Sequence, residues 1–130
     1  RPIVPVIRTP NSGTRAYFKR HVLNGEDFCS AAVVKSSFES LIEEIYENEG
    51  AVGFGGLSYG RELNHCKING VAPVPENVRN DTYPIIRYLY FYTVNTPKGE
   101  LKRFIDWTLS AEGQNIVNKS GYIPIWEISY

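Results

Sequence analysis

Short apolar runs alternate with helix-forming segments over the first 54 residues, and this alternation limits the chain to a small set of folds. The runs cover residues 3–8, 31–34 and 51–54. Their length and apolar character, with turn residues at their ends, predict buried strands. Pro5, which has no backbone N–H, must then lie at a sheet edge or near the start of its strand. The order β-α-β-α-β predicts an α/β fold, with a parallel sheet and flanking helices.

The two segments between these runs carry the signals of amphipathic helices. Ser12 or Thr14 can cap a first helix that runs to about Leu23. Ser36 and Glu39 predict a capping box at the start of a second helix. Apolar residues follow at the i, i+3, i+4, i+7 and i+8 spacing of one buried helix face. They are Phe38, Leu41, Ile42, Ile45 and Tyr46.

The second half of the chain carries weaker local signals. Residues 57–80 are mixed in character and contain prolines and asparagines, which predicts loops and short elements. Residues 85–94 predict a long aromatic strand. A helix is expected to open at Thr96-Pro97, because proline favours the first helical turn. A break at residues 110–113 predicts the start of a second helical piece.

Composition limits the setting and the partners of the chain. The 14 lysines and arginines balance 14 aspartates and glutamates, so the formal net charge is zero. A neutral chain gives no reason to expect nucleic acid as a partner. The sequence contains no methionine, and we expect it to be a processed product or a piece of something longer. Cys29 and Cys66 leave two alternatives open, one disulfide or two buried thiols.

The turn between the first strand and the first helix concentrates groups that can bind an anion. Arg8 ends the strand, and Ser12, Gly13 and Thr14 open the helix. A helix N-terminus offers free N–H groups and the positive end of the helix dipole. Gly13 has no side chain to keep an anion from the backbone, and Arg8 can present a planar fork to two oxygens. The same residues also fit an ordinary strand-turn-helix junction, because Ser-Gly-Thr is a common run.

The run from Arg8 to Thr14, followed by an aromatic residue at Phe18, resembles the second half of the phosphate site in periplasmic phosphate-binding proteins. Further segments agree with that family in order and spacing, so that the resemblance covers nearly the whole chain. They are Gly50–Phe54, Tyr83–Tyr90, Phe104–Gln114 and Gly121–Pro124. The resemblance implies a type 2 periplasmic binding fold, in which two α/β lobes close over the anion. It also implies phosphate contacts from Arg8, Ser12, Gly13 and Thr14.

The resemblance has implications for the organisation of the chain. Residues 1–82 would form the anion-binding α/β lobe. Residues 83–130 would supply a returning strand and C-terminal helices that belong to the partner lobe. The remaining family contacts fall in an N-terminal stretch absent from this sequence. The family often has an acidic residue two positions after the arginine, where this sequence has Pro10.

The function that the resemblance implies is binding of inorganic phosphate by the substrate-binding component of an ABC importer. Its partners would be the transporter membrane subunits and either an N-terminal lobe or a second copy of the chain. Its location would be periplasmic or extracytoplasmic, with anchoring to a membrane through the absent N-terminus left open. No cofactor and no metal are expected, and His21 and His65 lack the spacing of metal ligands.

Three other functions stay open at this point. The chain could belong to a receptor for another tetrahedral oxyanion, such as sulfate, molybdate or tungstate. It could be a phosphoester hydrolase that uses Ser12, although no base for that hydroxyl is evident, and we therefore expect no enzyme. It could also be a degenerate lobe that is kept for interaction alone.

The glycine-rich run Gly53–Gly56 completes no nucleotide-binding motif and predicts a turn at a strand end.

Overall fold

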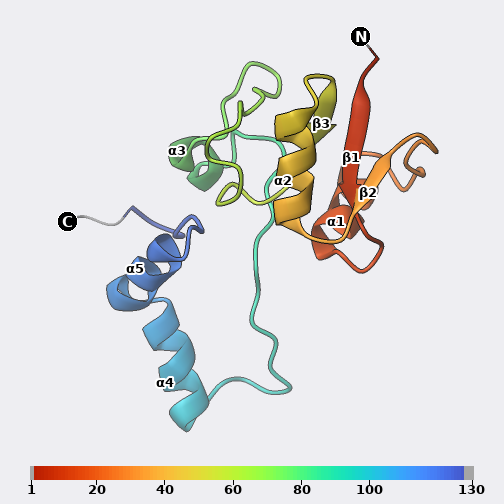
Figure 1. Ribbon diagram of the computed structural model, residues 1–130. Helices are drawn as coiled ribbons and strands as arrows, with labels where there is room; N and C mark the ends of the chain where they lie inside the picture. Colours follow the sequence, from red (N-terminus) through yellow and green to blue (C-terminus); the bar gives the residue numbers. More distant parts are fainter. Residues whose placement is uncertain (1, 128–130) are drawn as a thin grey trace. The chain divides into compact units, whose positions relative to one another are not determined.

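The three apolar runs form a parallel sheet in the order β2-β1-β3 (Figure 1). The strands are β1 (Val4–Arg8), β2 (Val33–Lys35) and β3 (Ala51–Gly53). Val6 of the central strand lies opposite Val33 on one side and Gly53 on the other. The α/β class with a parallel sheet and flanking helices is therefore confirmed.

Pro5 lies in the central strand without breaking the sheet. Val4 donates its N–H to the Gly50 carbonyl at 2.9 Å, on the side of β3. Successive N–H groups point to opposite sides of a strand. Since the Val4 N–H points toward β3, an N–H on residue 5 would point toward β2, and proline has none to offer there. Pairing with β2 begins only at Val6. Of the two positions that the sequence allows for Pro5, the strand start is the one found.

Helix α2 (Phe38–Glu47) covers one face of the sheet and contacts all three strands. Val6 is fully buried on this face, and Leu41 of the helix is 3% exposed. A Cβ atom on Gly53 would lie 2.8 Å from Ile45 Cδ1, so the helix sits directly against the backbone of β3. The absence of a side chain at this position permits the close packing of helix on strand.

Helix α1 (Gly13–His21) covers the opposite face of the sheet. Ile7 points away from Val6 along the strand and is also buried. Phe18 of this helix stacks on Phe54, with ring centroids 3.9 Å apart, and Phe28 joins the same stack at 6.0 Å from Phe54. Parallel strands with right-handed crossovers place the two helices in this way, because β2 and β3 lie on opposite sides of β1.

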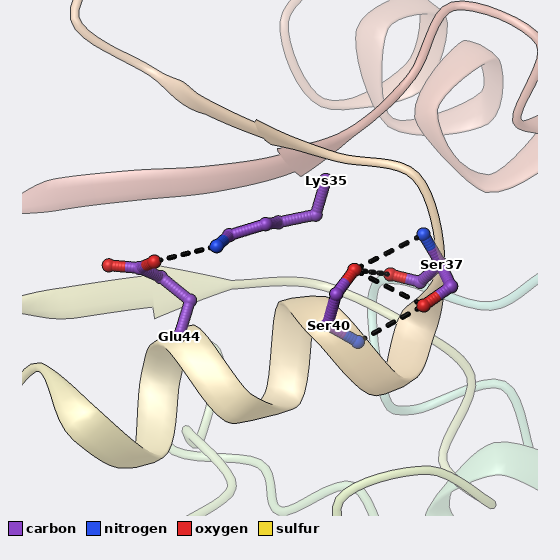
Figure 2. A network of polar contacts seen from close by, with 4 residues as sticks. All are labelled: Lys35, Ser37, Ser40 and Glu44. Carbon is purple, nitrogen blue, oxygen red and sulfur yellow. Dashed lines mark hydrogen bonds and ion pairs between the residues drawn. The ribbon is translucent and has the colours of Figure 1, made fainter.

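The capping box of α2 lies one residue later than the sequence predicts. Figure 2 shows Ser37 and Ser40 as the reciprocal pair, with the Ser40 N–H donating to Ser37 Oγ at 3.1 Å and the Ser37 N–H donating to Ser40 Oγ at 3.3 Å. The predicted box of Ser36 and Glu39 is therefore wrong. Pairing between the strands carries β2 as far as Lys35, and the helix begins only at Phe38.

An ion pair ties α2 to the sheet. Lys35 Nζ lies 2.8 Å from Glu44 Oε2, with about a quarter of each side chain exposed (Figure 2). The Lys35 ammonium holds the pKa of Glu44 below its ordinary value, first by its hydrogen bond and then by its charge. The pair joins the last residue of β2 to the second turn of the helix.

The chain divides into two units, residues up to Asn64 and residues from His65 onward. This computed structural model describes residues 2–127. The boundary after residue 82 that the sequence predicts refers to the lobes of a longer protein, and it stays a prediction. Arg1 and residues 128–130 of the predicted ranges lie outside the described residues.

The second unit contains three helices in its described part. They are α3 (Pro75–Arg79), α4 (Gly99–Thr108) and α5 (Ala111–Lys119). Ser110 caps α5 by accepting the Gly113 N–H, which confirms the predicted break. The preceding helix begins at Gly99, two residues after Pro97, so its predicted start is early. No helix within residues 2–127 is long and apolar enough to span a bilayer.

A buried glutamine holds the end of the second unit together. Gln114 is 4% exposed, and its amide N–H donates to the Thr108 carbonyl at 2.9 Å. Its side-chain oxygen accepts the Ile125 N–H, also at 2.9 Å. The amide therefore links α4, α5 and the segment that follows them, with both of its polar ends satisfied.

The predicted strand at residues 85–94 is wrong for this chain. The segment forms no ladder with any described residue. Tyr92 is 90% exposed and Val94 is 99% exposed. Local preference alone does not make a strand, because its N–H and C=O groups need a paired neighbour.

The two cysteines are free, and both are exposed. Cys29 precedes β2 in the first unit, and Cys66 lies in the second unit. The sequence left open a disulfide or two buried thiols, and neither is found. The Cys66 carbonyl accepts a hydrogen bond from the Tyr83 hydroxyl at 3.5 Å, and partial burial raises the pKa of this phenol.

Leu41→Ala should destabilise the first unit by about 2–5 kcal/mol, because it leaves a cavity between α2 and the sheet. Glu43→Ala on the exposed side of the same helix should change stability by less than about 0.5 kcal/mol. Urea unfolding followed by circular dichroism measures both variants. Equal losses in the two would contradict the assignment of Leu41 to the core.

Glu44→Gln should lower stability at neutral pH, because the amide carries no charge to pair with Lys35. A folded-state pKa below the ordinary 4.5 contributes stability that is present above that value and lost as the pH falls through the folded pKa. The difference in thermal midpoint between wild type and variant should therefore shrink as the pH falls from 7 to below 4.5. A difference that stays constant into acid would show that the ion pair is not its source.

Candidate functional site

The carboxyl ends of the strands and the starts of α1 and α2 meet at one edge of the sheet (Figure 1). Parallel pairing produces this arrangement, because each strand leads into the next helix from the same edge. Arg8 ends β1, and Ser36 and Ser37 follow the end of β2. All four residues that the sequence predicts as ligands lie here.

The start of α1 has the composition of an anion site. Ser12 caps the helix, and its Oγ accepts the Arg15 N–H at 3.3 Å. Gly13 and Thr14 are the first helical residues, so their N–H groups have no acceptor within the helix. Gly13 is exposed. These donors lie at the positive end of the helix dipole.

The first turn of α1 carries no acidic residue, whereas each of the other described helices has a glutamate there. Acidic residues usually occupy this position because they interact favourably with the helix dipole. In α1, Thr14 stands at the position of these glutamates, and the basic residue Arg15 follows it. The local charge therefore favours an external anion.

Arg8 is turned toward the start of α2. One Nη group donates to the Ser36 carbonyl at 2.8 Å, and the guanidinium carbon lies 4.6 Å from the centroid of the Phe38 ring. Its Nε is buried and has no hydrogen-bond partner among the described groups. No hydrogen bond within residues 2–127 joins the guanidinium to residues 12–14. Both sets offer donors, so an acceptor placed between them could link them.

Arg15 lies beside the candidate site, and the sequence did not predict it there. Its Nη1 donates to the Arg8 carbonyl at 2.7 Å, and its guanidinium carbon lies 5.2 Å from the centroid of the Phe28 ring. These contacts tie the end of β1 to the first turn of α1. The signal in the sequence is a basic residue directly after Ser-Gly-Thr, where an acidic residue is usual.

The turn between Arg8 and Ser12 is held by its own polar groups. Thr9 donates its hydroxyl to Asn11 Oδ1 at 2.7 Å and its N–H to the Lys35 carbonyl at 3.1 Å. The Ser12 N–H in turn donates to the Thr9 carbonyl at 3.0 Å. Pro10 is exposed in this turn, at the position where the resembled family often has an acid.

Arg8 has no carboxylate partner in the described part of the chain. Within residues 2–127 no ion pair forms on its guanidinium. The positive charge of Arg8 does affect one carboxylate, that of Glu39. A hydrogen bond from the backbone N–H of Glu39 lowers its pKa most, the Ser37 hydroxyl adds to this, and the charge of Arg8 contributes less.

The other candidate residues do not assemble a second centre. His21 contacts the ring of Tyr17, with centroids 4.5 Å apart. Residues 2–127 contain no group of three or more histidine, cysteine, aspartate or glutamate side chains that could hold a metal ion. β3 ends at Gly53 and residues 54–56 are irregular, so the turn that the sequence predicts lies later: the Gly56 carbonyl accepts the Tyr59 N–H at 3.0 Å.

Residues 1–112 match a family model described as a PBP superfamily domain. Because the match extends over most of the chain, the chain belongs to this superfamily. The predicted resemblance and the type 2 periplasmic-binding-protein-like fold are thereby confirmed.

Named relatives agree with this assignment. Phosphate-binding protein PstS of Bacillus subtilis (strain 168) is 33% identical over 129 residues, which is 97% of this chain and 43% of that protein. The protein of the same name from Pseudomonas aeruginosa is 30% identical over 136 residues, covering 96% of this chain and 42% of that protein. The chain thus spans less than half the length of these curated relatives.

Solved structures show the same fold. A Clostridium perfringens protein described as a phosphate ABC transporter substrate-binding protein, solved with bound phosphate, is 33% identical, with a TM-score of 0.76 over 96% of this chain and 53% of that one. A phosphate-binding protein of a phosphate ABC transporter from Streptococcus pneumoniae gives a TM-score of 0.80 at 22% identity, over 99% of this chain and 54% of that one. The second likeness supports the fold alone.

Two substitutions at Ser12 should distinguish its contribution to helix stability, as the N-cap, from its contribution to anion affinity. Ser12→Ala should destabilise the chain by about 1 kcal/mol, because the Arg15 N–H loses its acceptor. Ser12→Asp should keep the cap, since aspartate is an equally good N-cap, but its charge should repel an anion at this helix start.

Urea unfolding and titration with inorganic phosphate measure the two properties separately. We expect Ser12→Asp to unfold like wild type and to bind phosphate at least about tenfold more weakly. Unchanged phosphate affinity in Ser12→Asp would place the anion away from α1.

Proposed function

We propose that this chain is part of a receptor that binds inorganic phosphate for an ABC importer, with the anion at the start of α1. The observation that carries the proposal is the set of donors at one sheet edge. This set combines the N–H groups of Gly13 and Thr14, the Ser12 hydroxyl and the Arg8 guanidinium, beside a first turn without acid.

The chemistry of these donors fits an oxyanion. Phosphate at neutral pH carries between one and two negative charges and offers acceptor lone pairs in tetrahedral directions. A guanidinium can serve two of its oxygens, and backbone N–H groups at a helix start can serve another. Because no described carboxylate pairs with Arg8, its charge remains available to the ligand.

Phosphate is proposed over other oxyanions because of the relatives. Sulfate, molybdate or tungstate would find the same donors at the start of α1. The names of the matched proteins refer to phosphate, and one matched structure contains it. These matches favour phosphate.

We also propose that residues from Tyr83 onward complete a partner lobe, as the resemblance implies. The described part of this segment exposes many large apolar side chains. They include Leu89, Tyr90, Phe91, Tyr92, Leu101, Phe104 and Trp107. Residues 85–94 are apolar, and in the partner lobe they would gain the neighbouring strands that they lack here. Alternatively, a second copy of the chain would bury these apolar side chains.

The proposed role is binding without chemistry. Ser12 Oγ accepts a backbone N–H as a helix cap, and no described histidine or carboxylate hydrogen-bonds to it. The membrane subunits of the importer are the proposed partners, and a periplasmic or extracytoplasmic location is part of the same proposal. The matched relatives are named as binding proteins, which supports this role.

Arg8→Ala should reduce phosphate affinity by about 1.5–3 kcal/mol, the range for a charge-assisted hydrogen bond. We expect the 130-residue chain to bind phosphate in about the millimolar range, because it holds only part of the donors. Titration calorimetry with phosphate and with sulfate compares the two anions on wild type and variant. Arg20→Ala, at an exposed position in the last turn of α1, is the matched control for loss of one charge.

Two results would contradict the proposal. Equal affinity in Arg8→Ala and wild type would remove Arg8 from the site. Binding of sulfate in preference to phosphate would favour the alternative oxyanion receptor.

A further inference from the structure

Two other segments of the first unit meet on the ring of Phe38, the first residue of α2: the end of β1 and the connection that follows β3. The guanidinium of Arg8 lies over the ring, with its central carbon 4.6 Å from the ring centroid. Tyr59 stacks on the ring at 4.6 Å with an interplanar angle of 19°. The backbone of Gly55 lies against it so closely that a Cβ atom there would be 2.8 Å from Phe38 Cε1.

The guanidinium has few other restraints. One Nη group donates to the Ser36 carbonyl at 2.8 Å. No ion pair within residues 2–127 orients it, and its buried Nε has no partner among the described groups. A long side chain with a single hydrogen bond keeps considerable rotational freedom unless a surface fixes its plane. The Phe38 ring is such a surface.

We propose that Phe38 is a positioning residue that fixes the plane of the Arg8 guanidinium for the anion. The ring sets the plane by cation–π contact, and the Ser36 carbonyl sets the rotation within that plane. The other Nη group, which makes no hydrogen bond within residues 2–127, then remains for an acceptor outside the chain. This role rests on the proposed function, because the acceptor that it serves is the phosphate.

A ring and a neutral carbonyl orient Arg8 without cancelling its charge. A carboxylate in the same place would also orient the guanidinium, but it would compete with an anion for the same positive group. The arrangement therefore combines fixed geometry with a full positive charge. Gly55 belongs to it, because a larger residue would push the ring from its place.

The first test measures the contact itself in the 130-residue chain, without any anion. Protons held over an aromatic face shift upfield in NMR spectra, so the side-chain protons of Arg8 should be displaced in wild type. Phe38→Tyr should keep this displacement, because it keeps the aromatic face. Phe38→Leu and Gly55→Ala should reduce it, and Tyr46→Leu at an exposed position of the same helix should not.

The second test measures affinity for inorganic phosphate by NMR titration. Phe38→Leu should weaken binding about three- to tenfold, and Phe38→Tyr should restore it. In an Arg8→Gln background, Phe38→Leu should have no further effect, because the ring acts through the guanidinium. A merely structural role would weaken binding equally in both backgrounds.

The outcomes separate this role from the proposed function. Unchanged Arg8 shifts in Phe38→Leu would overturn the positioning role, as would equal loss of affinity in the two backgrounds. Absence of phosphate binding in wild type would overturn the proposed function, while the Arg8 shifts would still decide whether Phe38 orients the guanidinium.

Discussion

Hydrogen bonding on both sides of β1 is the constraint on which the first unit depends. Because β2 and β3 run parallel to it, all three strands end at one edge, and α1 and α2 start there. Val6 and Ile7 bury the two faces of this central strand. The core and the proposed anion site therefore share one short element, and damage to its packing would also displace Arg8.

Local patterns predicted the elements of the first unit because these elements are local. The apolar runs and the helical spacing each lie within about ten residues, and the ends of the elements agree with them within one or two positions. Tyr46 is an exception to the predicted buried helix face, because it lies near the end of α2 and is 74% exposed. The capping box was misplaced because Ser36 and Ser37 are both good caps, and only the pairing of Lys35 with Arg8 decides between them. Residues 85–94 failed as a strand because a strand depends on partners that are distant in sequence.

The candidate site also has a part that local sequence predicts and a part that it does not. Ser12, Gly13 and Thr14 follow one another at a helix start, so sequence alone could place them together. The contacts of Phe38 could not be predicted, because they join residues from three separate segments. Side-chain contacts of this kind leave no periodic pattern in the sequence.

The first turn of α1 has a consequence for the stability of the unliganded protein. A glutamate at such a position typically adds about 0.3–1 kcal/mol to a helix, and α1 lacks this contribution. None of its residues is fully buried either. A negative charge bound at this turn would supply a similar contribution. An anion bound at this turn would therefore add to the stability of α1, and binding would be coupled to the rigidity of the helix start.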